Sequence, residues 1–210
     1  NGLYTKDTGL TQRADGSSKT WYYVRNGAYT KATCYAQKLD TDDTSFYTVE
    51  DGICTGIVLG EKTVFVYGSE LPGSLFTGLT GTQMKILKAI EDTPTTEQGY
   101  CAGWVTNVFN NAGFWGSVIG NACDMWEWYC DSDDYSDLQP GMIIAVKQSP
   151  TYLGQIYGHV GIYLGNGMMA DSTGVISIQT VSSWIDSWDY AGTAAWGYPD
   201  EIKALVAKGN

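Results

Sequence analysis

The chain has 210 residues, and its apolar fraction of 43% is enough for a packed core, which excludes an extended disordered chain. No run of about 18 apolar residues occurs, so the sequence predicts no membrane-spanning helix. The net charge is −11, with 7 basic and 9 acidic residues in positions 1–78 and 5 basic and 14 acidic residues in positions 79–210. Because neither part carries a basic stripe, the composition argues against nucleic-acid binding and favours a neutral partner such as a sugar or a peptide.

Positions 8–68 carry a repeated pattern of short strands and tight turns. Residues 21–24 (Trp-Tyr-Tyr-Val) and 46–49 (Phe-Tyr-Thr-Val) lie 25 positions apart, and each is followed one residue later by Asn-Gly or Asp-Gly. Those dipeptides are the strongest short signals for a β-hairpin. A fainter third unit spans residues 57–68. Because a single hairpin cannot bury a core, stacked hairpins are expected, and residues 1–78 are predicted to form a small all-β module.

The aromatic residues of these units have two alternative roles. They could be core and cross-strand pairs, or they could form an exposed surface that stacks on sugars or on quaternary ammonium groups. The Trp-Tyr-Tyr pattern resembles the repeats of choline- and glucan-binding modules of bacterial surface proteins. That resemblance implies a module that binds cell-wall material through Trp21, Tyr22, Tyr23, Phe46 and Tyr47.

Two helices are predicted after a linker. Residues 68–81 are rich in Gly, Ser, Pro and Thr, as linkers are. Thr80 and Gln83 then have the spacing of a capping box, and the helix that they open must end before Pro94. A second apolar periodicity of helical type begins at Cys101.

Cys101 is thus predicted at a helix N-terminus, behind a glycine-containing loop. There the helix dipole and the unpaired backbone N–H groups favour a thiolate and supply part of an oxyanion hole. The alternative is that Cys101 is a small buried apolar side chain. His159 is the only histidine, and it is the base that a thiol nucleophile requires. A single histidine argues against a zinc peptidase or amidase, because typical hydrolytic zinc sites use two or three.

Residues 157–172 predict a hairpin around the glycine-rich positions 165–167. With a three-residue loop, Asp171 lies opposite Gly161, two residues along from His159 on the same face of the sheet, and the small Gly161 leaves room for the carboxylate. A two-residue turn would place Asp171 on the other face. The length of the loop therefore decides whether Asp171 can orient the imidazole, and we expect the three-residue loop.

The chain has five cysteines, so at least one thiol is unpaired in a monomer. Bridges between Cys34 and Cys54 and between Cys123 and Cys130 would leave Cys101 free, as a thiol nucleophile requires. Sequence separation alone does not show either bridge.

Residues 82–198 resemble papain-like bacterial cell-wall cysteine peptidases of the NlpC type and the related CHAP domains. The NlpC-like motifs are Leu-Gln-Pro-Gly at 138–141 before an apolar strand at 142–146, Gly-His-Val-Gly-Ile-Tyr-Leu-Gly-Asn-Gly at 158–167, and an acid twelve residues after the histidine. Residues 99–105 and 120–126 are closer to CHAP domains. The resemblance implies an α+β, papain-like fold for residues 79–210, in which a helical part carries Cys101 and an antiparallel sheet carries His159 and Asp171. Residues 196–198 would form its closing strand.

The chain departs from the NlpC pattern on both sides of the cysteine. NlpC enzymes usually carry Asp before the nucleophile and Ser after it, whereas Tyr100 and Ala102 stand at these positions. Recognition of a free amino-terminal group of the substrate is therefore left open. Tyr100, Ala102 and nearby polar groups are the candidates for the rest of the oxyanion hole and for substrate contacts.

The resemblance implies hydrolysis of an amide bond in the peptidoglycan peptide by Cys101, His159 and Asp171, without a metal or other cofactor. Two alternatives stay open: a CHAP-like amidase that cuts between muramic acid and L-alanine, and a non-catalytic wall-binding protein with a vestigial triad. We expect a secreted, wall-associated monomer whose partner is the peptide or glycan of peptidoglycan. The start at Asn1, without Met or a cleavable leader, is interpreted as a processed or trimmed form of a secreted protein.

Overall fold

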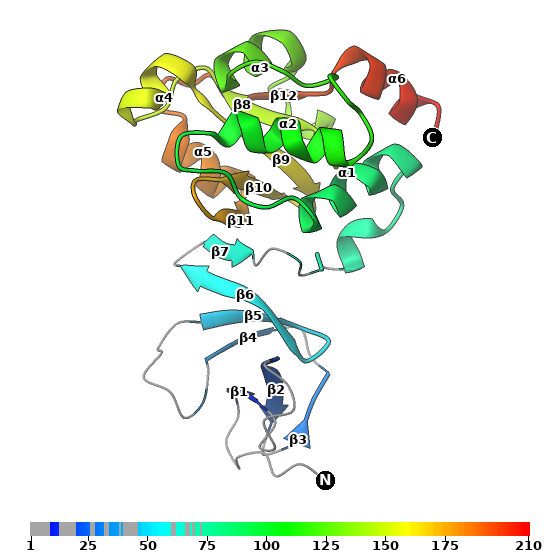
Figure 1. The fold of residues 1–210 in the computed structure, drawn as a ribbon, viewed down its shortest axis with the longest axis vertical. Coiled ribbons are helices and arrows are strands. Elements are labelled where there is room, and N and C mark those ends of the chain that lie inside the picture. Colours follow the sequence, from blue (N-terminus) through cyan, green and yellow to red (C-terminus); the bar gives the residue numbers. More distant parts are fainter. Residues whose placement is uncertain are drawn as a thin grey trace. The chain divides into compact units, whose positions relative to one another are not determined.

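The computed structural model describes residues 9–12, 20–25, 28–31, 34–37, 39, 46–59, 62–65, 68, 70–71 and 73–210. The chain divides into two compact units, Asn1–Val66 and Tyr67–Asn210 (Figure 1). Positions 68–78, which the sequence analysis placed with the first module, belong to the second unit. Within the described ranges, no helix is long and apolar enough to cross a membrane.

The first unit consists of short antiparallel strands. They are β1 (Gly9–Thr11), β2 (Tyr22–Arg25), β3 (Ala28–Tyr29), β4 (Cys34–Gln37), β5 (Phe46–Glu50), β6 (Ile53–Leu59) and β7 (Lys62–Phe65). Strand β2 pairs with β1, β3 and β6, while β5 pairs with β4 and β6, and β6 pairs with β7. The predicted hairpins are confirmed, although the Asn-Gly turn at 26–27 lies outside the described residues.

The second hairpin closes through the predicted Asp-Gly turn. Glu50 pairs with Ile53, and the two residues between them, Asp51 and Gly52, have φ values of 45° and 81°. Positive φ at both central residues matches the right-handed twist of the flanking strands, which explains why Asp-Gly is favoured here.

Most of the aromatic residues proposed for wall binding contribute to packing in this unit. Tyr47 is 4% exposed and forms a small core with Leu10 and Val49, against which Trp21 and Tyr23 pack. The expectation that Tyr47 offers an exposed stacking face is wrong, because its ring is needed to bury the core of a module with short strands. The side chain of Phe46 lies outside the described residues. Tyr22 meets the exposed Tyr29 edge to face, with ring centroids 5.9 Å apart.

The second unit is α+β, and its helical part comes first along the chain. Its helices are η1 (Gly73–Phe76), α1 (Gly81–Glu91), α2 (Cys101–Asn111), α3 (Ala122–Tyr129), η2 (Tyr135–Asp137), α4 (Tyr152–Tyr157), α5 (Val181–Trp188) and α6 (Asp200–Ala207). Its strands are β8 (Ile143–Val146), β9 (His159–Gly165), β10 (Met168–Ser172), β11 (Ile176–Thr180) and β12 (Ala195–Gly197). Adjacent strands run antiparallel in the order β11–β10–β9–β8–β12. This confirms the predicted papain-like arrangement, including the closing strand.

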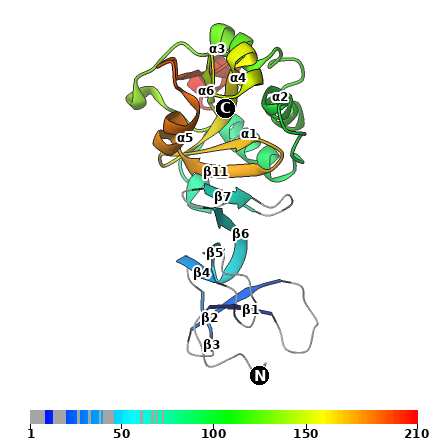
Figure 2. The same ribbon diagram turned by 90° about the vertical axis from the view of Figure 1, so that its left-hand side faces the viewer.

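The core of the second unit lies between its sheet and its helices. Helix α2 packs on β9 and β10, α3 packs on β8, β9 and β12, and α5 packs against β11 (Figures 1 and 2). All residues of β8 and β9 are buried, as the continuous apolar runs predict. Large side chains from both layers, among them Trp104, Phe109, Ile144 and Ile162, are fully buried.

The helix boundaries follow the local signals. The Thr80 hydroxyl accepts from the Gln83 N–H at 3.2 Å, and the Gln83 side chain accepts from the Thr80 N–H at 3.0 Å, so the capping box is confirmed. Helix α1 ends at Glu91, before Pro94. Helix α2 begins at Cys101, as predicted.

The β9–β10 hairpin contains both a two-residue turn and a bulge. Gly165 pairs with Met168 around Asn166 and Gly167, so the predicted three-residue loop is wrong. The register then shifts, and the strand beyond the shift pairs Asp171 with Gly161. A bulge adds one residue to one strand, so it reverses the parity that the short turn would otherwise impose. Asp171 therefore lies on the face of His159 after all.

Candidate active site

Cys101 is the first residue of α2 and is 8% exposed. The preceding residue, Tyr100, makes no side-chain cap hydrogen bond to the helix. The first N–H groups of an α-helix have no acceptor within the helix. The amides of Cys101 and Ala102 therefore point from an uncapped helix end, beside the thiol, and can donate to an oxyanion.

His159 is the first residue of β9 and is 4% exposed. Gly158, with φ of 75°, joins the end of α4 to this strand. A Cβ atom at Gly158 would collide with the backbone carbonyl of Val146 on the neighbouring strand β8. Only glycine fits this left-handed corner, and the corner brings the imidazole to the end of the sheet.

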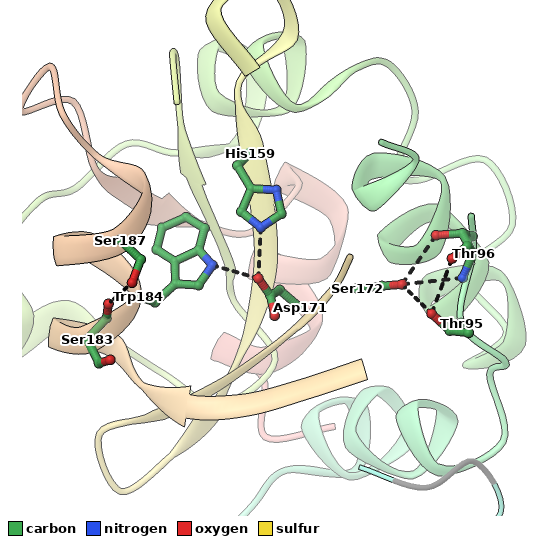
Figure 3. A network of polar contacts seen from close by, with 8 residues as sticks. All are labelled: Thr95, Thr96, His159, Asp171, Ser172, Ser183, Trp184 and Ser187. Carbon is green, nitrogen blue, oxygen red and sulfur yellow. Dashed lines mark hydrogen bonds and ion pairs between the residues drawn. The ribbon is translucent and has the colours of Figure 1, made fainter. Parts of the chain in front are cut away.

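Asp171 binds the imidazole directly. Its Oδ2 lies 2.8 Å from His159 Nε2, and the carboxylate is fully buried (Figure 3). Cys101 and His159 line the same cavity, and interaction with Cys101 contributes to raising the pKa of the imidazole. Because Nε2 is engaged by Asp171, Nδ1 is the nitrogen left for the thiol. The structure thus brings together the three residues that the sequence analysis selected, from α2, β9 and β10. The space above Gly161, however, is taken by Ala170 and Met169 and not by the carboxylate.

Two tryptophans of α5 complete the surroundings of His159. Trp184 donates its Nε1–H to the same Asp171 oxygen at 3.1 Å and stacks on the imidazole, with centroids 5.5 Å apart and planes at 23° (Figure 3). The Trp188 ring lies 4.0 Å from the imidazole centroid. The sequence analysis did not assign the donor role of Trp184. The available signal was the i, i+4 spacing of two tryptophans, which places them on one helix face.

The environment of His159 favours its protonated form. Burial lowers the pKa of the imidazole, but hydrogen bonds and charge interactions with Asp171 and Cys101 outweigh it and raise the pKa to about 9. At neutral pH the site therefore holds an imidazolium between a carboxylate and a sulfur. This is the pairing that a thiolate nucleophile requires.

A hydroxyl network joins the Asp171 strand to the loop before Cys101. The Ser172 hydroxyl, fully buried, lies 2.8 Å from the Thr95 hydroxyl and 3.3 Å from both the N–H and the hydroxyl of Thr96 (Figure 3). The Thr96 hydroxyl in turn donates to the Tyr100 carbonyl at 2.9 Å. The network fixes the segment that leads into the nucleophile relative to β10.

A cavity of about 800 Å³ opens beside Cys101 and His159. Tyr100 and Ala102 line it at the start of α2, Tyr152 and Tyr157 line it from α4, and Trp188 closes it from α5. Both residues predicted to contact substrate thus face the cavity. In the described part of the chain, no cluster of three His, Cys, Asp or Glu side chains is arranged to hold a metal ion.

Cys123 and Cys130 are thiols, so the bridge considered between them is wrong. They lie at the two ends of α3, and seven residues of helix separate their Cα atoms by about 10 Å, beyond the ~7 Å limit for a disulfide. Burial raises the pKa of the Cys130 thiol to about 12, and burial together with the Asp124 carboxylate raises that of Cys123. The bridge considered between Cys34 and Cys54 is untested, because the Cys34 side chain lies outside the described residues.

The chain is similar in fold to solved NlpC-type structures. No known family model and no curated protein sequence matches it. NlpC2 from Trichomonas vaginalis is 15% identical, with a TM-score of 0.44 over 94% of this chain and 71% of that chain. NlpC1 from the same organism is also 15% identical, with a TM-score of 0.44 over 93% and 68%. An NlpC/P60 family protein from Bacillus cereus is 13% identical, with a TM-score of 0.42 over 94% and 62%. At these identities and TM-scores, the chemistry has to be argued from the site itself.

Proposed function

We propose that this chain is a cysteine hydrolase that cleaves an amide bond of peptidoglycan. The observation that carries the proposal is the arrangement around His159, whose imidazole bonds the buried Asp171 and lines the same cavity as Cys101. The proposal is further supported by the cavity, which gives a substrate access to both the Cys101 thiol and the His159 imidazole.

The arrangement supports acyl transfer in two steps. The Cys101 thiolate attacks the amide carbonyl carbon, and the oxygen becomes an oxyanion within reach of the N–H groups at the start of α2. The His159 imidazolium gives its proton to the leaving amine nitrogen, the C–N bond breaks, and a thioester remains. His159 then takes a proton from water, and the hydroxide attacks the thioester. The acid product leaves and the Cys101 thiolate is regenerated, while Asp171 holds the imidazole in one orientation throughout.

The wall substrate is supported by the resemblance of the motifs and by the charge of the protein. The chain carries a net charge of −11, which favours neutral ligands over nucleic acid or anionic lipid. Action on peptidoglycan would place the protein outside the cell, and the hairpin module of the first unit is the candidate for attachment to the wall.

Digestion of purified peptidoglycan tests the proposal. The wild-type protein should release soluble fragments, and mass spectrometry should show a new amine and a new carboxylate at one amide bond. Cys101→Ala should release none, while Cys123→Ala, which removes a thiol outside the triad, should act like the wild type. Equal release by the Cys101→Ala variant would refute a thiol mechanism.

A further inference from the structure

Helix α3 carries an exposed tryptophan next to the rim of the cavity. Trp128 is 55% exposed, and its ring reaches back along the helix to Gly120. A Cβ atom at Gly120 would come within 2.8 Å of Trp128 Cζ3 and of Asp124 Cβ, so the indole rests directly against this glycine. Residues 120–122 line the cavity beside Cys101. The exposed indole therefore borders the rim of the cavity from the outside.

The indole is held in place by its neighbours. Side chains on a helix lean towards its N-terminus, so a ring at position 128 covers positions 124 and 120. The Tyr129 ring meets the indole edge to face, with centroids 6.2 Å apart. The Tyr129 hydroxyl also accepts from the Ile119 N–H at 3.2 Å, which ties the segment before α3 to the last turn of the helix. A ring that is already ordered loses little entropy when a ligand binds to it.

Asp124 places a carboxylate beside the indole. Its Oδ2 accepts from the backbone and side-chain amides of Asn121 at 2.8 Å and 3.1 Å. In the described part of the chain, the polar contact of Oδ1 is the Cys123 thiol at 3.9 Å, so Oδ1 keeps the capacity to accept from a hydroxyl. A flat apolar face with a hydrogen-bond acceptor at its edge matches a sugar ring, which has C–H groups on its faces and hydroxyls around its edge.

The charge around the indole favours a neutral sugar over other ligands. Asp124, the exposed Glu127 and a net charge of −11 disfavour an anionic ligand. An apolar protein or lipid surface would have to remove water from these carboxylates without bonding them, which costs free energy. A sugar covers the ring and gives hydroxyl donors to the carboxylate.

We propose that Gly120, Asp124 and Trp128 form a platform that binds a sugar ring of the wall glycan while the attached peptide occupies the cavity. This platform rests on the proposed function and extends it, because cleavage of an amide bond requires contacts with the peptide alone. Residues 120–122 belong to the cavity and adjoin the platform, so the sugar and the peptide of one substrate can bind side by side.

Two forms of one wall peptide test the platform. One is linked to the wall disaccharide, and the other carries only the lactyl group, which keeps every amide bond but lacks the sugars. The full chain should cleave the disaccharide form with kcat/KM about tenfold above that of the lactyl form. Trp128→Ala should remove this preference by lowering kcat/KM for the disaccharide form alone, and Trp128→Phe, which keeps an aromatic face, should retain part of it.

Tyr135→Ala is the matched control, because Tyr135 is also an exposed ring, at 56%, but lies on η2 and does not line the cavity. It should leave the preference for the disaccharide form unchanged. If Trp128→Ala lowered kcat/KM for both forms equally, or left the preference in place, the platform would be refuted.

Binding separates the platform from the proposed function. If neither form is cleaved, the proposed function fails, but the affinity of the peptide-free disaccharide for the Cys101→Ala variant is still measurable. Adding Trp128→Ala should weaken that affinity by about tenfold. The hairpin module is the same in both proteins, so any sugar binding by that module does not affect the comparison. Unchanged affinity would overturn the proposal, as would self-association of the protein that Trp128→Ala abolishes without weakening sugar binding.

Discussion

The imidazole of His159 is held at its edges and on its faces. Nε2 lies 2.8 Å from Asp171, and the centroids of the Trp184 and Trp188 rings lie 5.5 Å and 4.0 Å from that of the imidazole. The carboxylate at one edge and the two aromatic rings on the faces therefore hold the imidazole in one orientation. A group held in this way requires little reorganisation when the reaction begins.

Among the cysteines of the second unit, Cys101 should be the one that iodoacetamide labels fastest near neutral pH. It lines the cavity beside His159, whereas the pKa values of the Cys123 and Cys130 thiols are raised by burial, that of Cys130 to about 12. Mass spectrometry of peptides from the briefly labelled native protein measures the three rates. His159→Ala should slow labelling of Cys101 alone. Equally fast labelling of Cys123 or Cys130 would contradict the assignment.

The activity should decline in alkaline solution as His159 loses its proton. Its pKa of about 9 lies above the ordinary 6.5, so the imidazolium persists through neutral pH and disappears as the pH rises through about 9. The alkaline limb of kcat/KM should therefore have an apparent pKa near that value. Asp171→Asn removes a charge that raises the pKa, so the limb should move to lower pH while kcat falls by about two to four orders of magnitude. An unmoved limb in this variant would show that Asp171 does not act on His159.

Trp184→Phe should keep the ring stacked on His159 but remove the N–H that bonds Asp171. Without this donor the carboxylate charge is less dispersed, so it should hold the imidazolium more tightly and shift the alkaline limb upward. The Asp171 carboxylate is also freer to rotate without this hydrogen bond. We therefore expect kcat to fall by about threefold to tenfold, equivalent to ~1 kcal/mol. Trp196→Phe, on β12, is a matched control, because this variant loses a 3.1 Å hydrogen bond from the indole N–H to the Asp134 carbonyl. The pH profile of the control should stay unchanged.

At the scale of elements, the site depends on how three segments are tied together. The bulge of the β9–β10 hairpin sets the face of Asp171, and the uncapped start of α2 presents the Cys101 thiol. The loop between α1 and α2 is held to β10 through Ser172. These features depend on backbone geometry and on hydroxyl hydrogen bonds, and not on the reacting groups themselves.

Ser172→Ala should loosen that loop without changing the reacting groups. The variant loses the hydroxyl contacts with Thr95 and Thr96, so the free energy of unfolding should fall by ~1–3 kcal/mol. Labelling of Cys101 should also slow, because the segment before it is no longer fixed to the strand of Asp171. Ser187→Ala, which removes a 2.8 Å bond to the Ser183 carbonyl within α5, is the control. Wild-type labelling in Ser172→Ala would show that the loop is positioned by other contacts.

At the scale of the whole chain, the second unit includes residues that the sequence analysis assigned to the linker. Leu71 and Leu75 are buried, and the Leu71 N–H donates to the Glu91 carboxylate at 2.7 Å. The N–H of Gly68 donates to the Glu91 carbonyl at 3.0 Å. These residues therefore pack against the C-terminal end of α1, although their composition resembles that of a linker.

A protein that starts at residue 67 should therefore be more stable than one that starts at residue 79. The shorter protein exposes the apolar surface that Leu71 and Leu75 cover, and it leaves the buried Glu91 carboxylate with one hydrogen bond donor fewer. Two leucines and one such hydrogen bond predict a loss of about 3 kcal/mol or more in the free energy of unfolding. Denaturant unfolding of the two proteins measures it. Equal stability would place the domain boundary at residue 78.

The sequence by itself determined the features that depend on a few neighbouring residues. The capping box at Thr80, the Asp51–Gly52 turn and the start of α2 at Cys101 follow from hydrogen bonds and backbone angles within one turn of chain. Because the chain has a single histidine, His159 was the only histidine that could serve as the base for a thiol. The resemblance of the motifs selected Asp171.

Only the tertiary structure decided what distant segments do to one another. The bulge that returns Asp171 to the face of His159 reflects the pairing of two whole strands, and the Trp184 donor comes from a helix that follows β11. The cavity wall combines residues from several helices, and the burial of Tyr47 depends on partners across its sheet. Sequence spacing sets the direction of a side chain along its own element, but its surroundings are set by elements that the chain reaches only after folding.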